Sequence, residues 1–153
     1  MSNPLTSVRS GVWSYLDADT DLNAFIDAGE GTRYRFADSV NLPVRLAAGD
    51  CPALIVEPVR GEVDWETTAD QVILYRLEVI GCLYETAAAE LEEFAYLAYA
   101  ALAAGLPDFG VAEVEAVEFA GPAFSNYRKG GARFEEFRLG VAARIHEALP
   151  PGA

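Results

Sequence analysis

The sequence predicts a single α+β domain spanning residues 1–153, with an antiparallel or mixed sheet of about four main strands. An N-terminal helix and one long helix are expected on one face of that sheet. Three observations predict this fold class. Apolar residues alternate from Gln71 to Tyr84, they follow the helical period from Thr86 to Leu106, and two further alternating runs close the chain. The expected order is helix, strand, strand, helix, strand, strand.

The first predicted helix runs from Leu5 to Leu16, where apolar residues recur at spacings of three and four. Thr6 or Ser7 is its expected cap. An Asp-rich turn follows, and Asp21 is expected to cap a short helical turn beyond it. That turn carries the apolar residues Leu22, Phe25 and Ile26.

The segment from Gly31 to Asp50 has an irregular pattern and is predicted to be a long surface connection, with a short strand at Tyr34-Arg35-Phe36. The run from Ala53 to Glu57 is compact, contains β-branched residues and lies between two prolines. These features predict a strand.

The run from Gln71 to Tyr84 predicts a longer strand with two different faces. One face is apolar throughout and is expected to meet the core. It comprises Ile73, Tyr75, Leu77, Val79, Gly81 and Leu83. Arg76 and Glu78 interrupt the other face, which is apolar again towards its ends. A sheet that faces water would not need those residues, so we expect the ends of the second face to be covered.

A long helix is predicted from Thr86 to Leu106, with Thr86 as its cap and acidic residues in its early turns. It is expected to pack across the sheet face that carries Leu77 and Val79. Tyr96 and Tyr99 lie on its other flank, so the second half of the helix is apolar nearly all round. A second layer or a neighbouring subunit is expected to cover that flank.

Two strands, Val111 to Phe119 and Phe134 to Ile145, are predicted to form the closing hairpin. The glycine-rich segment from Gly121 to Arg133 between them is predicted to be a long, flexible loop. It holds Tyr127, Arg128, Lys129 and Arg133. Basic and aromatic residues on a very acidic chain suit docking to an acidic partner, which includes another copy. A solvated loop is the alternative interpretation.

The composition excludes several classes of protein. A hydrophobic fraction of 52% with 23% charged residues excludes a disordered chain and leaves apolar material for subunit contacts. A formal net charge of −13 disfavours ordinary nucleic-acid binding. The longest apolar stretch, residues 94–106, is too short to span a membrane. Cys51 and Cys82 fit no metal pattern and are expected to be free, buried thiols of a protein made in a reducing compartment.

The sequence contains no set of residues that predicts catalysis, a cofactor or a metal. Asp17, Asp19 and Asp21 match the opening of a calcium loop, but its later glycine and glutamate are missing, so capping is the favoured interpretation. His146 is the single histidine and lies near the end of the last predicted strand. Gly29-Glu30-Gly31 lacks the rest of any nucleotide-binding motif. We therefore expect no enzyme.

The order of elements resembles that of phage tail terminator and tail-completion (neck) proteins. The resemblance rests on the N-terminal helix, the segment Cys51 to Pro58, the strand Val72 to Tyr84 that runs into the Ala-rich helix, and the closing hairpin ending in Phe134-Glu135-Glu136-Phe137-Arg138-Leu139. It implies a virion protein, made in the host cytoplasm, that forms a homo-oligomeric, hexameric ring at the head–tail junction. The implied neighbours are the tail tube protein and the connector proteins. It implies no catalytic residues.

Such a ring would let DNA pass without binding it specifically, and acidic residues would suit its lumen. The candidate lumen acids are Glu62, Asp64, Glu66 and Asp70, which belong to one predicted loop. Solubility is the alternative role of these charges. The competing functional hypothesis is a non-catalytic module that binds a small ligand or a partner in a pocket between helix and sheet. Tyr75, Phe94 and Phe137 would line that pocket.

Overall fold

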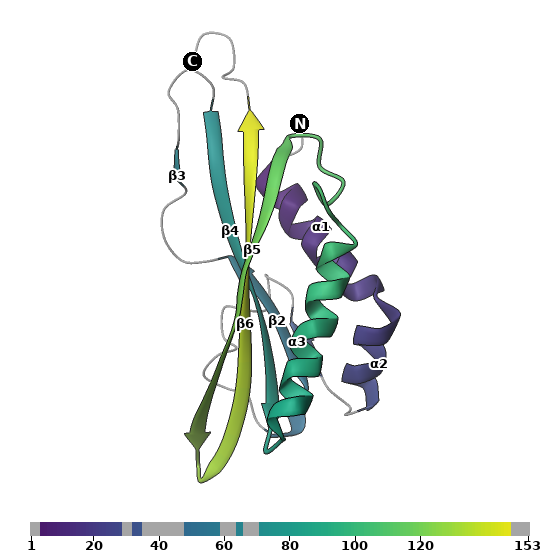
Figure 1. Cartoon of the computed structure of the whole chain (residues 1–153), viewed down its shortest axis with the longest axis vertical. Coiled ribbons are helices and arrows are strands. Elements are labelled where there is room, and N and C mark those ends of the chain that lie inside the picture. Colours follow the sequence, from purple (N-terminus) through teal and green to yellow (C-terminus); the bar gives the residue numbers. More distant parts are fainter. Residues whose placement is uncertain (1–3, 29–31, 35–47, 59–63, 66–70, 148–153) are drawn as a thin grey trace.

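The computed structural model describes residues 4–28, 32–34, 48–58, 64–65 and 71–147 (Figure 1). The helices are α1 (Pro4–Ala18), α2 (Thr20–Ala28), α3 (Ala88–Ala103) and the short 3-10 helix η2 (Ala48–Asp50). The strands are β1 (Thr32–Tyr34), β2 (Ala53–Pro58), β3 (Asp64–Trp65), β4 (Gln71–Tyr84), β5 (Val114–Lys129) and β6 (Ala132–Glu147).

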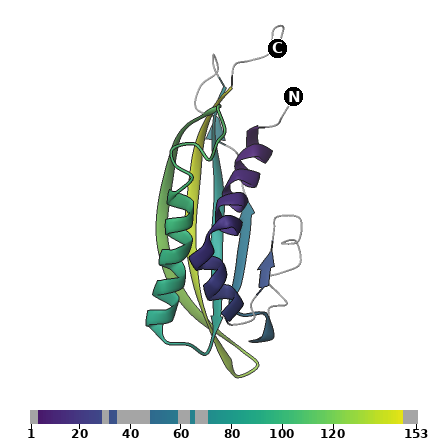
Figure 2. The same cartoon turned by 90° about the vertical axis from the view of Figure 1, so that its right-hand side faces the viewer.

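The strands form one sheet in the order β1-β2-β4-β6-β5, with β3 paired to β4 off this path. The β1–β2 pair is parallel and the other pairs are antiparallel, so the sheet is mixed. The helices α1, α2 and α3 form a layer on one face, which we call the helix face (Figure 2). The opposite face is called the outer face. The predicted α+β class, with four main strands and the helices on one face, is confirmed.

The core lies between the helix layer and the middle of the sheet. Leu77 and Val79 are buried there with α3 residues, as predicted. Phe94 of α3 meets Phe137 of β6 edge to face at 5.1 Å between ring centroids, and Phe25 of α2 stacks on Phe94 at 4.9 Å. A Cβ atom at Gly81 would collide with the Phe137 ring. The missing side chain at Gly81 therefore makes room for the central aromatic stack.

The three predicted helix caps are wrong. α1 begins at Pro4, so Thr6 and Ser7 lie inside this helix rather than at its cap. The amide of Leu22 donates to the Asp19 carboxylate at 2.8 Å, so Asp19 rather than Asp21 caps α2. The cap position of α3 is Ala87, which makes no side-chain hydrogen bond to the helix. The Thr86 hydroxyl donates instead to the carboxylate of Glu90. The helix starts one residue later than a Thr86 cap would place it, because Thr86 bonds a side chain rather than the backbone.

The predicted flexible loop from Gly121 to Arg133 is also wrong, because most of that segment belongs to β5. β5 and β6 stay paired down to Lys129 and Ala132, and only Gly130 and Gly131 form the turn, with φ of 60° and 84°. These angles are natural for glycine. Gly121 and Pro122 form a bulge in β5 rather than its end, since the register shifts between Ala120 and Ala123.

The short strand predicted at Tyr34-Arg35-Phe36 is β1, which begins earlier, at Thr32. Residues 35–47 of the predicted long connection lie outside the described residues. The strand predicted to start at Val111 begins at Val114 instead, because residues before it form turns.

Candidate assembly surfaces

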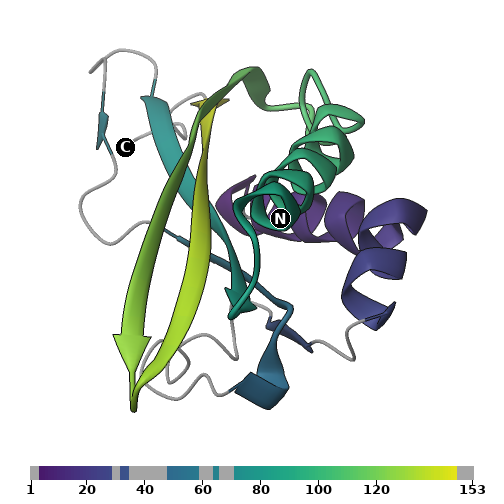
Figure 3. The same cartoon turned by 60° about the horizontal axis from the view of Figure 1, so that its bottom comes forward.

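The turned end of the hairpin brings together three of the predicted contact residues. We call residues 127–134 the hairpin tip. Arg128 and Arg133 are directly opposite each other across the two strands, and Lys129 follows beside the turn. Figure 3 shows this end of the hairpin pointing away from the helix layer. The three residues therefore lie close together, but on a strand pair rather than on the predicted loop. Their contact role stays a prediction.

The hairpin tip carries positive charge that its own chain compensates only in part. Like charges directly opposite each other on antiparallel strands destabilise a sheet. Arg133 forms an ion pair with the largely buried Glu135, whereas Arg128 is exposed and has no ion pair with any residue that the structure describes. The side chain of Lys129 lies outside the described residues. Arg128 is thus available to an acidic group from outside.

A polar hollow of about 350 Å³ lies beside the hairpin tip, where the tip meets the turn that leads into α3. Arg128, Arg133, Thr86 and Glu85 line it. The tip is held against that turn by a 2.9 Å hydrogen bond from the Glu85 amide to the Arg133 carbonyl. Two guanidinium groups in one hollow can accept a carboxylate from a partner, and the positive end of the α3 dipole acts in the same direction.

The second candidate surface is a row of exposed aromatic side chains along α3 and the edge strand β5. Tyr96 is 67% exposed, Tyr99 is 41% exposed and Phe124 is 49% exposed. Tyr99 packs edge to face on the half-buried Phe119 at 5.4 Å. We call these four residues the aromatic flank. Phe124 was missed because the sequence pattern predicted a loop there, although the β-strand spacing from Phe119 is broken only by the bulge.

Tyr127 differs from the other predicted contact residues because much of its ring packs within its own chain. The ring stacks on Phe134 at 5.2 Å and 9°. Burial raises the pKa of the Tyr127 hydroxyl, and contact with Cys82 raises it further. The residue therefore supports the hairpin tip from the outer face rather than projecting from it.

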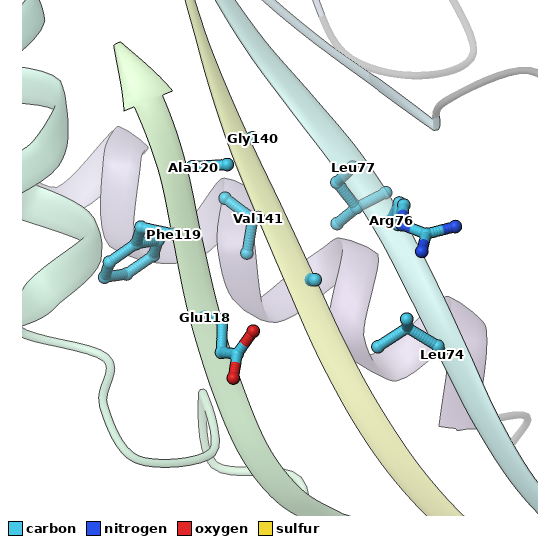
Figure 4. A pocket seen from close by; sticks show the side chains of 9 residues that line it. Leu74, Arg76, Leu77, Glu118, Phe119, Ala120, Gly140 and Val141 are labelled. Carbon is cyan, nitrogen blue, oxygen red and sulfur yellow. The ribbon is translucent and has the colours of Figure 1, made fainter. Parts of the chain in front are cut away.

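The outer face has a shallow hollow of about 260 Å³ at its middle (Figure 4). Its floor is formed by the small residues Ala120, Gly140 and Ala142, and Arg76 and Glu118 stand on opposite sides. Farther along the same face, Arg138 bridges Glu78 at 2.8 Å and Glu136 at 2.9 Å. These contacts, led by that with Glu136, raise the pKa of Arg138. The hollow can accept one apolar side chain between two opposite charges.

The pocket predicted between helix and sheet is filled by its own side chains. Phe94 and Phe137 are fully buried and in contact with each other, and Tyr75 packs against the same core. Of the candidate lumen acids, Glu62, Glu66 and Asp70 lie outside the described residues. Asp64 is placed only as the backbone of β3, opposite Leu74.

The residues that the structure describes bring together no group of side chains that could hold a metal ion. No cluster of three or more His, Cys, Asp or Glu side chains is present there. Asp19 is used as a helix cap, and the backbone amide of His146 donates to the Glu113 carbonyl at the start of the hairpin. Within the same residues, no helix is both long and apolar enough to cross a membrane.

Comparison with solved structures finds a similar chain in the virion of a native gene transfer agent (GTA) particle. The two chains share 18% sequence identity with a TM-score of 0.54, and the match covers 90% of this chain and 93% of that chain. At this identity the likeness shows a shared fold over nearly the full length of both chains. No protein-family model matches the sequence. No curated protein matches it either.

Proposed function

We propose that this chain is a structural subunit of a phage-like virion, and that it forms a ring at the head–tail junction that terminates or completes the tail tube. One observation carries the proposal: nearly the whole chain shares its fold with a chain of the gene transfer agent virion, and nearly the whole of that chain is matched. Because only a small part of each chain lies outside the match, the shared unit is the whole subunit rather than a common accessory domain.

The aromatic flank supports self-assembly. Aromatic residues are enriched at protein interfaces, and they concentrate binding energy there. Tyr96 and Phe124 are exposed in the single chain, whereas comparable rings of the core are fully buried. Phe119 and Phe124 of the flank lie on β5, which is an edge strand of the sheet in the described residues. A neighbouring copy that covers this edge would remove apolar surface from water and protect the outer side of β5.

The hairpin tip supports docking to an acidic surface. Arg128 and Arg133 share a hollow, and the chain as a whole carries a formal net charge of −13. A second copy therefore offers acidic surface to the tip, and so would any acidic neighbour in the neck. The same negative balance suits a ring through which DNA passes without sticking.

Size-exclusion chromatography with light scattering tests the assembly step. The chain should form a closed oligomer whose population rises with protein concentration. Tyr96→Ser combined with Phe124→Ser should shift the assembly towards monomer, because both changes remove exposed rings of the flank. Leu106→Ser is the control, since Leu106 is an exposed apolar residue outside the aromatic flank and the hairpin tip. A wild-type chain that stays monomeric at every concentration, alone and with its virion neighbours, would contradict the ring.

The position in the particle needs a separate test. Cells that produce the particle without this chain should accumulate filled heads and unjoined tails of irregular length. Adding the purified chain to those two fractions should restore joined particles. Complete, infective particles assembled without the chain would exclude a role at the head–tail junction while leaving another virion role open.

The alternative function, a non-catalytic binding module, has one observation in its favour. The outer-face hollow between Arg76 and Glu118 has an apolar floor and opposite charges at its sides. It suits an apolar side chain of a partner peptide more than a free ligand, because it is shallow and open. Ala142→Leu should fill the hollow. If this change abolishes binding to neck or tail proteins and leaves the oligomer intact, the hollow rather than the aromatic flank carries the partner contact.

A further inference from the structure

The two cysteines of the chain meet on the outer face, although 31 positions separate them in the sequence. Cys51 lies two residues before Ala53, the first residue of β2, and Cys82 lies in β4 opposite Ala53. Their Sγ atoms are 3.8 Å apart, and no disulfide joins them. The sequence predicted two buried, unconnected thiols, so the contact between them is a finding of the structure.

The surroundings give the two thiols different access to solvent. Cys82 is fully buried in a small apolar cluster with Ile55, Ile80 and Phe134. The Tyr127 hydroxyl lies 3.7 Å from the Cys82 sulfur and covers it from the hairpin side. Cys51 is only half-buried at the margin of the same cluster. A small reagent can therefore reach Cys51 first, and Cys82 only through Cys51.

We propose that Cys51 and Cys82 form a modification site, a dithiol that small-molecule disulfides oxidise to an intrachain disulfide. In the first step, the Cys51 thiolate attacks one sulfur of the reagent, and the other sulfur leaves as a thiolate. In the second step, the Cys82 thiolate attacks Sγ of Cys51 and expels the remaining half of the reagent. Two cysteine thiols are oxidised, one reagent disulfide is reduced to two thiols, and the two protons pass to those products.

Access to solvent, rather than thiolate stability, sets this order of steps. The Cys51 thiol donates to the Cys82 sulfur, which raises the pKa of Cys51 and slows its first attack. After Cys51 has reacted, the Tyr127 hydroxyl remains beside the Cys82 sulfur and favours its thiolate for the second, resolving attack. The sulfur atoms need to approach by roughly 2 Å to reach bonding distance. Cys51 lies outside the strand ladder, between η2 and β2, where such a shift breaks no strand pairing.

The disulfide would tie the entry of β2 to the middle strand of the sheet. The bond closes a loop that contains β2, β3 and most of β4, so it removes conformational freedom from the unfolded chain. The chemistry does not depend on the proposed virion role. If the chain has that role, the thiols stay reduced in the host cytoplasm and are oxidised after the particle leaves the cell.

The purified, reduced full-length chain treated with oxidised glutathione tests the proposal. Free thiols titrated in denaturant should fall from two to none. The intact mass under non-reducing conditions should fall by two hydrogen atoms, with no glutathione retained and no covalent dimer. The folding equilibrium constant of the oxidised chain should exceed that of the reduced chain by roughly 10²- to 10³-fold in denaturant titrations.

Two variants separate this dithiol from a pair of unreactive thiols. Cys82→Ala should accumulate a stable mixed disulfide of glutathione at Cys51, because the resolving thiol is absent. Cys51→Ala should stay unmodified while folded, because Cys82 is buried. The proposal is wrong if the wild-type chain keeps both thiols, retains glutathione, or links to another chain. It is also wrong if Cys51→Ala is modified as fast as the wild type.

Discussion

The two faces of the sheet are built in different ways. The helix face is closed by α1, α2 and α3, and its aromatic side chains, Phe25, Phe94 and Phe137, contact one another in the interior. The outer face has no helix over it in the described residues, and its middle carries charged side chains and a shallow hollow. The first face therefore decides whether the chain folds, whereas the outer face and the β5 edge are available for contacts with other molecules.

The largest effect is expected from removing the central ring of the helix face. Phe94→Ala should lower the free energy of unfolding by about 3–5 kcal/mol, since it deletes a fully buried aromatic side chain. Tyr96→Ala is the matched control two residues along α3, and its effect should stay within about 0.5 kcal/mol because the ring is exposed. Urea titration measures both. Equal losses would mean that the aromatic stack is not the core.

The next effect compares two strand glycines, one on each face. Gly81→Ala should cost about 1–3 kcal/mol, because the added Cβ would collide with the Phe137 ring and force it out of the stack. Gly140→Ala places its Cβ 3.3 Å from the Cβ of Ala120 on the outer face, a tight contact that a small shift can relieve. Its cost should therefore be below about 1 kcal/mol.

Thermal and urea unfolding of the two glycine variants check this comparison, and near-ultraviolet circular dichroism reports the packing of the aromatic rings. The ring signal should change in Gly81→Ala and stay unchanged in Gly140→Ala. If Gly140→Ala is the more destabilised variant, then the outer face is packed as tightly as the core, and the distinction between the two faces fails.

The same contrast explains how much of the fold could be predicted from the sequence. β4 was predicted with its observed bounds, Gln71–Tyr84, because alternation of apolar residues reports the burial of one sheet face directly. The long helix was predicted from the helical period of its buried residues, although α3 spans Ala88–Ala103 rather than Thr86 to Leu106. The distal half of β5 was missed, because Gly121-Pro122 is typical of a turn. The exposed residues beyond it also show no alternation of buried and exposed positions.

The candidate surfaces were only partly predictable. Tyr96 and Tyr99 were identified because the helix carries more apolar residues than one buried face accounts for. The additional residues were expected to contact a second layer or a neighbouring subunit. The register that places Arg128 opposite Arg133, and the packing that joins Cys51 to Cys82, depend on contacts between distant segments. Local sequence patterns carry no information on such pairings, because strand register is set by the whole sheet.

A smaller effect is expected from the ion pairs of the outer face. Arg138→Gln should cost about 1 kcal/mol, because it leaves Glu78 and Glu136 without their shared cation beside Glu57, which is opposite Glu78. The loss should shrink at high salt, which screens the repulsion among these carboxylates. Arg144→Gln is the control, since its contact with Glu115 is longer, at 3.3 Å, and both side chains are substantially exposed. Salt-independent losses would rule out the electrostatic cause.

The smallest effect on stability is expected at the hairpin tip, and its sign is opposite to that of the others. Arg128→Glu replaces a like-charge pair across the strands with an opposite-charge pair to Arg133, so the single chain should gain about 0.2–1 kcal/mol. The same change inverts the charge that the tip offers to an acidic partner, so assembly should weaken. Arg128→Gln removes the charge without inverting it and should give intermediate values for both.

Denaturant titration of the dilute monomer and light scattering of the concentrated chain measure these two quantities on the same variants. The expected result is a more stable subunit that assembles less well, which no loss of folding can imitate. If Arg128→Glu assembles like the wild type, the tip does not dock, and the contacts between subunits must come from the aromatic flank. If assembly is lost and the monomer is also destabilised, the like-charge pair does not lower the stability of the monomer. The basic residues of the tip then stabilise a contact within the subunit.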